Sequence, residues 1–314
     1  MNILIYGGGA VGLGAAVSLV NNGEQVTIID LPETVHELRS RGIVQTGILG
    51  EHTVSPDSFK TFADIENIPL EKYDYILVCI KSFMSSATAG ALHTWQDIIG
   101  ENTPIVLFQN GWGNAEAFVE YFNRDRIFNA RVMTGFMKPA LHHVDITVHA
   151  DDVHAGSLFG VSSDILLPLC EALTAGGLSC ITTDTIERDL WAKMLYNCAL
   201  NPLGAMFNVK YERLAASEHS RHIMDSIFDE IFHVIRAAGF STHWKTADEY
   251  REVFYNTLVP ATAEHQSSML QDIRAGRRTE INAMNGAVVA LAKENKVEVP
   301  VNRTISGMIH FIEG

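Results

Sequence analysis

The most constraining feature of the sequence is a run of glycines between an apolar segment and a helical pattern. Residues 1–6 (MNILIY) are apolar and β-prone, and residues 7–23 (GGGAVGLGAAVSLVNNG) begin with glycines and continue with small apolar residues at helical spacing. In a GxGxxG turn the first glycine permits the tight turn, the second lets a pyrophosphate approach the backbone, and the third lets the helix pack closely. The helix N-terminus adds free amides for an anion. The pattern predicts a dinucleotide site formed by Gly7, Gly8, Gly9, Ala10, Val11 and Gly12, the alternative being a glycine-rich turn without a ligand.

Asp30 ends the second predicted strand, residues 24–30, and lies 18 residues after Gly12. An acidic residue about 20 residues after the turn hydrogen-bonds the adenosine ribose hydroxyls and repels a 2′-phosphate. We therefore expect NAD(H) to be preferred. A helix-capping or solvated Asp30 is the alternative. Because Arg39 and Arg41 lie close in the sequence, NADP(H) stays open.

The rest of the first half alternates between helical and strand patterns. A helix is predicted over residues 32–42 and another over about 84–98, and continuous apolar runs at 73–80 and 103–109 are typical of strands covered on both faces. These elements predict an α/β fold with a parallel sheet. Between residues 128 and 183 the pattern loosens, and we expect further strands that extend the same sheet.

From Asp184 onward the strand signal disappears. Apolar residues recur at helical spacing over about 186–207, 217–239, 244–275 and 279–295. The chain is therefore predicted to form a dinucleotide-binding domain at residues 1–183 and an all-helical C-terminal substrate or catalytic domain at residues 184–314. The crevice between two such domains is where a ligand is expected.

Three polar residues form a stripe in the first of these helices. Lys193, Asn197 and Asn201 are spaced by four residues, so they project from one face of an otherwise apolar segment. A buried polar stripe requires partners, and a ligand would supply them. A lysine there can donate a proton to a carbonyl oxygen as hydride arrives at the carbon. A solvated helix face is the alternative.

Two more polar residues follow predicted strands. Lys81 comes directly after the strand at 73–80, and Asn110 follows the strand at 103–109. Ligands bind at the carboxyl ends of strands in such sheets. We expect both residues to border the nicotinamide half of the cofactor.

Composition narrows the class of partner. The chain has 23 Lys and Arg against 37 Asp and Glu, a net charge of −14. This balance disfavours nucleic acid and membrane partners but allows small anions. Four scattered cysteines and no export signal indicate reduced thiols in a cytoplasmic protein. The thirteen histidines show no metal-ligand spacing, and we expect no metal site.

Taken together, these motifs resemble the ketopantoate reductase family over nearly the whole chain. The residues that carry the resemblance are GGGAVG at 7–12, Lys81, QNGWG with Asn110, the Lys193/Asn197/Asn201 helix running into NPLGAMFN, and SSMLQDIRAGRRTEINAMNG. The resemblance implies a Rossmann-type N-terminal domain, a helical C-terminal domain and reduction of 2-dehydropantoate to pantoate, a step of pantothenate biosynthesis.

The resemblance also implies roles for single residues. Lys193 would be the general acid at the ketone oxygen, with Asn110, Asn197, Asn201 and Ser268 binding the substrate. Asn110 and Glu280 would lie near the nicotinamide and ribose, with Lys81 at the edge of the cofactor.

Two departures from the family pattern affect the cofactor and the substrate. Better-known members carry a basic residue where this chain has Asp30 and use NADP(H), and residues 136–152 match the pattern poorly. A reductase of another small 2-keto or 2-hydroxy acid and a non-catalytic NAD-binding redox sensor are therefore alternatives. The sequence does not determine the oligomeric state, which leaves a homodimer open.

Overall fold

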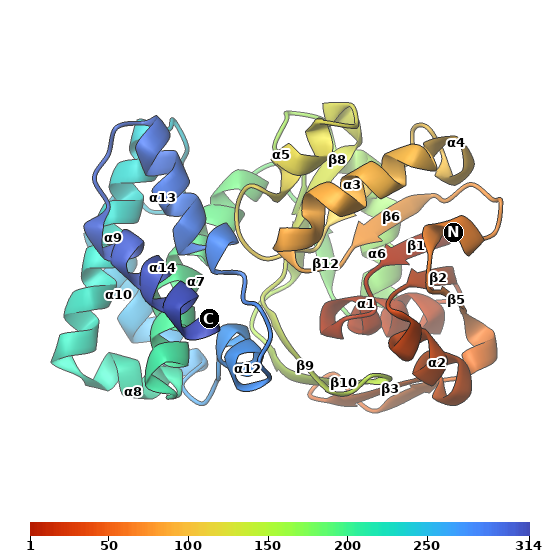
Figure 1. Cartoon of the computed structure of the whole chain (residues 1–314), viewed down its shortest axis with the longest axis horizontal. Coiled ribbons are helices and arrows are strands. Elements are labelled where there is room, and N and C mark those ends of the chain that lie inside the picture. Colours follow the sequence, from red (N-terminus) through yellow and green to blue (C-terminus); the bar gives the residue numbers. More distant parts are fainter. The chain divides into compact units, whose positions relative to one another are not determined.

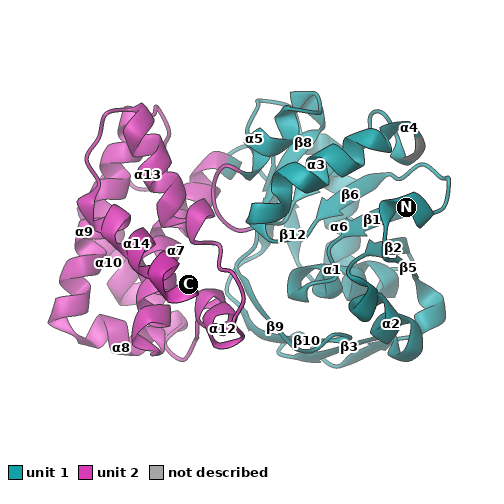
Figure 2. Ribbon diagram, in the orientation of Figure 1, with its two compact units in different colours: residues 1–109, 114–186 teal, residues 110–113, 187–314 magenta. Residues whose placement is uncertain are grey.

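The computed structural model describes residues 1–97 and 99–314, which form two compact units (Figure 2). The first unit contains residues 1–109 and 114–186, and the second contains residues 110–113 and 187–314. Residues 110–113 therefore belong to the second unit, although their neighbours in sequence belong to the first.

The first unit is built on an eight-stranded sheet of order β12-β11-β8-β7-β6-β1-β2-β5 (Figure 1). Neighbouring strands run parallel except for β8 and β11, which are antiparallel. Its strands are β1 (Asn2–Tyr6), β2 (Gln25–Ile29), β5 (Lys60–Phe62), β6 (Tyr75–Val78), β7 (Ile105–Leu107), β8 (Ile127–Arg131), β11 (Val153–Gly156) and β12 (Cys180–Thr182).

Six α-helices accompany these strands. They are α1 (Ala10–Asn21), α2 (Pro32–Arg41), α3 (Ser85–Thr94), α4 (Gln96–Ile99), α5 (Asn114–Val119) and α6 (Leu167–Ala175). Short 3₁₀ turns are η1 (Pro56–Ser58), η2 (Ile65–Asn67), η3 (Ser82–Met84), η4 (Arg124–Arg126) and η5 (Ser163–Leu166). The helix expected at about 84–98 is thus divided between η3, α3 and α4.

Apolar side chains cover both faces of the eight-stranded sheet. Successive strand residues point to opposite faces, so Ile3 and Ile5 of β1 lie in one buried cluster and Leu4 lies in the other. Helices α1 and α6 contribute to the first cluster, and α3 and α5 contribute to the second (Figure 1). Burial on both faces explains the continuous apolar runs of the central strands. The predicted α/β class is confirmed.

A second sheet packs against α1 and was not predicted. Its order is β4-β3-β10-β9, with β3 (Ile43–Gly47), β4 (His52–Val54), β9 (Thr134–Ala140) and β10 (His143–His149). The expectation that all strands between 128 and 183 extend the first sheet is wrong for β9 and β10, which pair with each other and with β3. The alternation of apolar and polar residues along β10 corresponds to one buried face, which contains Val144 and Ile146. This strand packs against α1. Periodicity alone does not specify which neighbour covers a strand.

The regular elements of the second unit, over the described residues, are all helical. They are α7 (Ile186–Phe207, whose first residue belongs to the first unit), α8 (Tyr211–Ala216), α9 (Glu218–Ala237), α10 (Ala247–Val253), the π-helix η6 (Phe254–Leu258), α11 (Val259–Ala261), α12 (Ser268–Arg274), the 3₁₀ turn η7 (Ile281–Ala283), α13 (Asn285–Glu294) and α14 (Pro300–Glu313). Within the described part of the chain, no helix is both long and apolar enough to cross a membrane.

The stretch of helical spacing at 244–275 is mostly helical in the structure, but it is divided into three helices and a π turn. Pro260 has no N–H to donate to the preceding turn, and the π turn of η6 lies directly before α11. The chain then leaves the helix, and α12 begins again after Ser267, whose hydroxyl accepts a hydrogen bond from the Leu270 amide at 3.1 Å.

A buried polar network joins four helices of the second unit. Pro202 lies inside α7 and lacks the N–H that would bond to the Cys198 carbonyl, so the Asn285 side chain donates to that carbonyl at 3.0 Å. Asn285 also donates to Asn302 on α14 at 2.9 Å. Glu230 on α9 accepts from the Asn302 backbone and side-chain amides at 2.9 and 2.7 Å. These bonds fix α7, which carries the predicted polar stripe.

Candidate functional site

The glycine turn joins β1 to α1, and two of its glycines are required by the protein itself. Gly7 has φ +112°, a conformation that side chains disfavour. A Cβ on Gly12 would lie 2.0 Å from the Gly7 carbonyl oxygen, so any side chain there would open the turn.

Gly9 has a different explanation. Its φ of −70° and ψ of −176° are open to any residue. A Cβ on Gly9 would meet only the Cys79 carbonyl oxygen, at an ordinary 3.7 Å. Neither conformation nor packing calls for glycine here, whereas a ligand close to the backbone at the start of α1 does. The turn therefore fits a dinucleotide pyrophosphate.

Asp30 follows β2 directly and lies against the turn. Its carboxylate accepts a hydrogen bond from the Leu31 amide at 2.6 Å, and Oδ2 lies 2.7 Å from where a Gly8 Cβ would be. Burial raises the pKa of Asp30 above its usual value, and the Leu31 amide, the Lys138 charge and the Gly8 amide oppose this rise.

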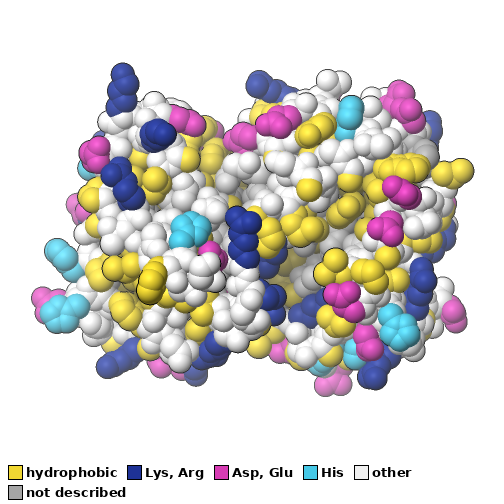
Figure 3. All heavy atoms as spheres, viewed as in Figure 1, with side chains coloured by type: hydrophobic (Ala, Val, Ile, Leu, Met, Phe, Trp, Pro, Cys, Tyr) yellow, Lys and Arg dark blue, Asp and Glu magenta, His cyan; other side chains and the backbone are white. Residues whose placement is uncertain are grey.

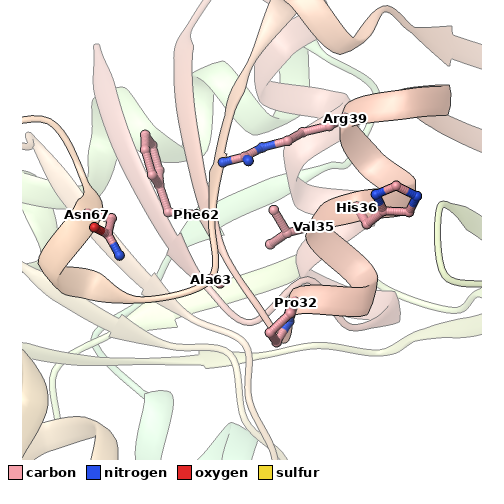
Figure 4. A pocket seen from close by; sticks show the side chains of 7 residues that line it. All are labelled: Pro32, Val35, His36, Arg39, Phe62, Ala63 and Asn67. Carbon is pink, nitrogen blue, oxygen red and sulfur yellow. The ribbon is translucent and has the colours of Figure 1, made fainter.

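The two arginines that left the cofactor choice open are engaged elsewhere. Arg39 donates from Nε to the Thr61 hydroxyl at 3.2 Å and from Nη2 to the Thr61 carbonyl, and Arg41 pairs with Glu37 at 3.1 Å. Arg39 borders a pocket of about 360 Å³ between α2 and the end of β5, where it points from α2 toward the Phe62 side (Figure 4). The charges that act on Asp30 come from Lys138 and Glu33.

Lys138 was missed by sequence reasoning. It lies on β9, and its Nζ donates to the Gly8 carbonyl oxygen at 2.7 Å. The available signal was the alternation of Phe136, Met137 and Lys138, which places the first and third on one face. Nothing in the sequence showed that this face meets the glycine turn.

In the second unit, the structure brings together Lys193, Asn110 and Glu280. Lys193 Nζ donates to Asn110 Oδ1 at 2.7 Å, and Asn110 Nδ2 lies 3.4 Å from Glu280 Oε2. Glu280 is buried and Lys193 is half-buried. A cation is thus held by an amide oxygen next to a carboxylate, an arrangement that can present N–H groups to a carbonyl oxygen.

The residues after Asn110 explain why it reaches this cluster. Gly111 has φ +91°, and a Cβ there would lie 2.3 Å from the Ala283 carbonyl oxygen. The Trp112 amide donates to that carbonyl at 2.8 Å. The Trp112 ring packs on Trp191 and Phe240, with ring centroids 4.6 and 4.9 Å away. Backbone and aromatic contacts therefore hold the loop 110–113 within the second unit.

The stripe on α7 is turned into the protein. Asn197 and Asn201 are 7% and 4% exposed, which argues against a solvated face. Asn201 Oδ1 accepts from the Tyr211 hydroxyl at 2.7 Å, and its Nδ2 lies 3.6 Å from Met284 Sδ. Tyr211 therefore fixes the orientation of the Asn201 amide, with Nδ2 as the donor side that already contacts Met284 Sδ.

The predicted site residues Ser268 and Lys81 lie on other elements of the chain. Ser268 is the half-buried first residue of α12, whereas the neighbouring Ser267 is fully buried and donates to the Asn201 carbonyl at 3.2 Å. Lys81 belongs to the first unit, three residues after β6 and directly before η3.

All four cysteines are free thiols. Cys170 and Cys180 form no CxxC motif, but their Sγ atoms lie 3.2 Å apart. Among the described residues, no three His, Cys, Asp or Glu side chains gather to hold a metal. On the face shown in Figure 3, acidic and basic side chains intermingle.

A glycine turn of this kind between β1 and α1, followed by an acid after β2, defines a dinucleotide-binding protein. Comparison with known families sharpens this class. A family model described as ketopantoate reductase PanE/ApbA matches residues 3–158, and its C-terminal counterpart matches residues 185–313.

Individual relatives agree with these matches. The chain is 37% identical to the 2-dehydropantoate 2-reductase of Aquifex aeolicus over 312 residues, 98% of this chain and 96% of the relative. A PanE/ApbA family ketopantoate reductase structure from Ralstonia eutropha JMP134 superposes with a TM-score of 0.85 at 25% identity, covering 100% of this chain and 98% of that one. A D-mandelate dehydrogenase with NADH and anilino(oxo)acetate gives a TM-score of 0.88 at 21% identity, covering 100% and 98%, which shows a shared fold.

The chain belongs to the ketopantoate reductase family, as the resemblance predicted. It is accordingly an oxidoreductase, and family membership supports a pyridine nucleotide as its cofactor.

The contrast between Gly9 and Gly12 gives a first prediction. Gly9→Ala should change the free energy of unfolding by less than about 0.5 kcal/mol, since the chain has room for the methyl group. The same variant should weaken dinucleotide binding by about tenfold or more. Gly12→Ala, the matched control, should destabilise the fold by about 1–3 kcal/mol. Denaturant titration and equilibrium binding measure the two effects, and a Gly9→Ala protein that binds dinucleotide normally would contradict this assignment.

Proposed function

We propose that the chain reduces 2-dehydropantoate to pantoate with hydride from a pyridine nucleotide. The observation that carries this proposal is the Lys193–Asn110 hydrogen bond of 2.7 Å beside the buried Glu280. Membership of the family supports the substrate.

The proposal divides the work between the two domains. Residues 1–183 bind the dinucleotide through Gly7–Gly12, Asp30 and Lys81, and residues 184–314 supply the catalytic lysine and the substrate amides. When bound, the nicotinamide supplies the hydride that reduces the 2-keto carbon. Asn110 and Glu280 would lie near the nicotinamide and its ribose.

Lys193 is the general acid in this mechanism. Negative charge develops on the ketone oxygen as the keto carbon accepts hydride. The oxygen then accepts a proton from the Lys193 ammonium and becomes the hydroxyl group of the product. Asn110 accepts a hydrogen bond from one N–H group of the ammonium, which holds Nζ in place. The neutral amine then regains its proton from solvent.

Amide side chains orient the substrate. Asn197 and Asn201 donate to its carboxylate and hydroxyl oxygens without adding charge, and Ser268 provides a hydroxyl. Tyr211 already occupies Asn201 Oδ1, so Asn201 presents N–H groups and favours an anionic or carbonyl oxygen.

The cofactor preference follows from Asp30. We propose NAD(H) as the preferred form, because a carboxylate there accepts from ribose hydroxyls and repels a 2′-phosphate. The engagement of Arg39 with Thr61 and of Arg41 with Glu37 supports this choice.

A substrate panel tests the proposed function. The oxidation of NADH and NADPH is followed by absorbance with 2-dehydropantoate, pyruvate and branched 2-keto acids. We expect kcat/KM for 2-dehydropantoate to exceed that for the others by about 100-fold or more, the scale set by several matched polar contacts. Equal turnover of other branched keto acids would contradict the substrate, and no turnover with dinucleotide binding intact would indicate a redox sensor.

The mechanism predicts a specific defect in Lys193→Met. Its kcat should fall on the order of 10²- to 10⁴-fold, because the ketone oxygen loses its proton donor. Dinucleotide affinity should stay within about threefold, a small part of the total binding energy. Lys210→Met removes an exposed lysine that pairs with Glu264 in the same unit and serves as the control. Unchanged turnover in Lys193→Met would exclude this lysine as the acid.

The Asp30 assignment predicts a lower dissociation constant for NADH than for NADPH. Asp30→Asn should narrow the difference, since the amide removes the charge that repels a 2′-phosphate and retains an oxygen that can accept hydrogen bonds. Isothermal titration with both dinucleotides measures this. A native protein that binds NADPH more tightly, or an unchanged ratio in Asp30→Asn, would contradict the role given to Asp30.

A further inference from the structure

A lysine of the second sheet, Lys138, contacts the glycine turn between β1 and α1. Phe136 and Lys138 are two residues apart on β9 and share a face of the strand. Phe136 packs on α1 at Gly14, where a Cβ would lie 2.4 Å from its ring. This close approach of β9 to α1 sets the position from which Lys138 reaches the Gly8 carbonyl oxygen at 2.7 Å.

The peptide of Gly8 is held between opposite charges. Its amide hydrogen-bonds to the Asp30 carboxylate, while its carbonyl accepts from Lys138. The Lys138 charge is also close enough to stabilise the ionised form of Asp30. The cation at this acid therefore comes from a strand more than a hundred residues further along the chain, and not from the α2 arginines.

We propose that Lys138 is a specificity-determining residue of the dinucleotide site, whose ammonium offsets part of the Asp30 charge, so that NADPH still binds, although less tightly than NADH. The inference rests on the proposed dinucleotide site. Asp30 alone would repel the 2′-phosphate of NADPH strongly, whereas a nearby ammonium weakens that repulsion without removing it. The ribose hydroxyls of NADH carry no charge, so their binding depends far less on Lys138.

A purely structural role for Lys138 predicts something different. If the lysine served only to hold the Gly8 carbonyl, its loss would loosen the turn and weaken both dinucleotides alike. The ratio of the two dissociation constants therefore separates the two roles.

The test measures the binding of NADH and NADPH without substrate. Lys138→Met keeps the aliphatic stem and removes the charge. Lys138→Gln also removes the charge and keeps a side-chain donor for the Gly8 carbonyl. In both variants the dissociation constant of NADPH should rise about tenfold, as expected for a lost charge at a partly exposed site, and that of NADH should change less than about threefold. The NADPH effect should shrink when salt is raised to about 0.5 M.

Two control variants complete the experiment. Lys138→Arg keeps the positive charge and should retain the native ratio. Lys60→Met removes a lysine of β5 that pairs with Glu71 in the same unit, and it should leave both constants unchanged.

The outcomes are distinct. Equal weakening of both dinucleotides in Lys138→Met and Lys138→Gln, or an unchanged ratio, overturns the role of Lys138 while the proposed function stands. Failure of the native protein to bind either dinucleotide would overturn the proposed function itself, and this inference with it.

Discussion

The hydrogen bond from the Lys193 ammonium to the Asn110 side-chain oxygen, 2.7 Å long, is the contact on which the candidate site depends. A half-buried cation needs a polar partner. This partner comes from the loop 110–113, which follows β7 in the sequence but belongs to the second unit. The loop is held by the Trp112 amide on Ala283 and by the Trp112 ring on Trp191. Aromatic packing of this kind contributes about 0.5–1.5 kcal/mol beyond burial. The aromatic residues therefore position the side-chain amide of Asn110 beside Lys193.

Under the proposed function, a chain of net charge −14 binds anions through local groups. The amides at the start of α1 and the ammonium groups of Lys138 and Lys193 would act over short distances, where screening by salt is weak. Asp30 shows that such a site lowers the stability of the fold. Because burial raises its pKa, its contribution to stability is greatest when the carboxyl is protonated, at low pH, and is lost as the pH rises through that raised pKa. Near neutral pH the fold therefore carries a half-buried carboxylate at some cost in stability, and perturbed acids of this kind are frequent at ligand sites.

Sequence patterns predicted the features that depend on local spacing. The α/β class, the turn after β1 and the family followed from apolar runs, glycine positions and ordered motifs, and the four-residue spacing gave the inward-facing stripe with Asn197 and Asn201. The features that were missed depend on distant contacts. Alternation in β9 did not reveal the second sheet, so Lys138 was overlooked. The helical spacing over 244–275 did not show where the helices end, and the structure has a π turn directly before Pro260, which lacks an N–H donor.

A structure of the protein bound to NADH and a non-reactive 2-keto acid analogue of 2-dehydropantoate tests the central claim most directly. The account predicts that the keto oxygen lies within hydrogen-bond distance of Lys193 Nζ, about 2.7–3.1 Å, while Asn110 still accepts from the same ammonium. It also predicts an adenosine ribose hydroxyl on the Asp30 carboxylate. A complex in which Lys193 binds only the carboxylate of the acid, with the keto oxygen directed elsewhere, would contradict the proposed mechanism.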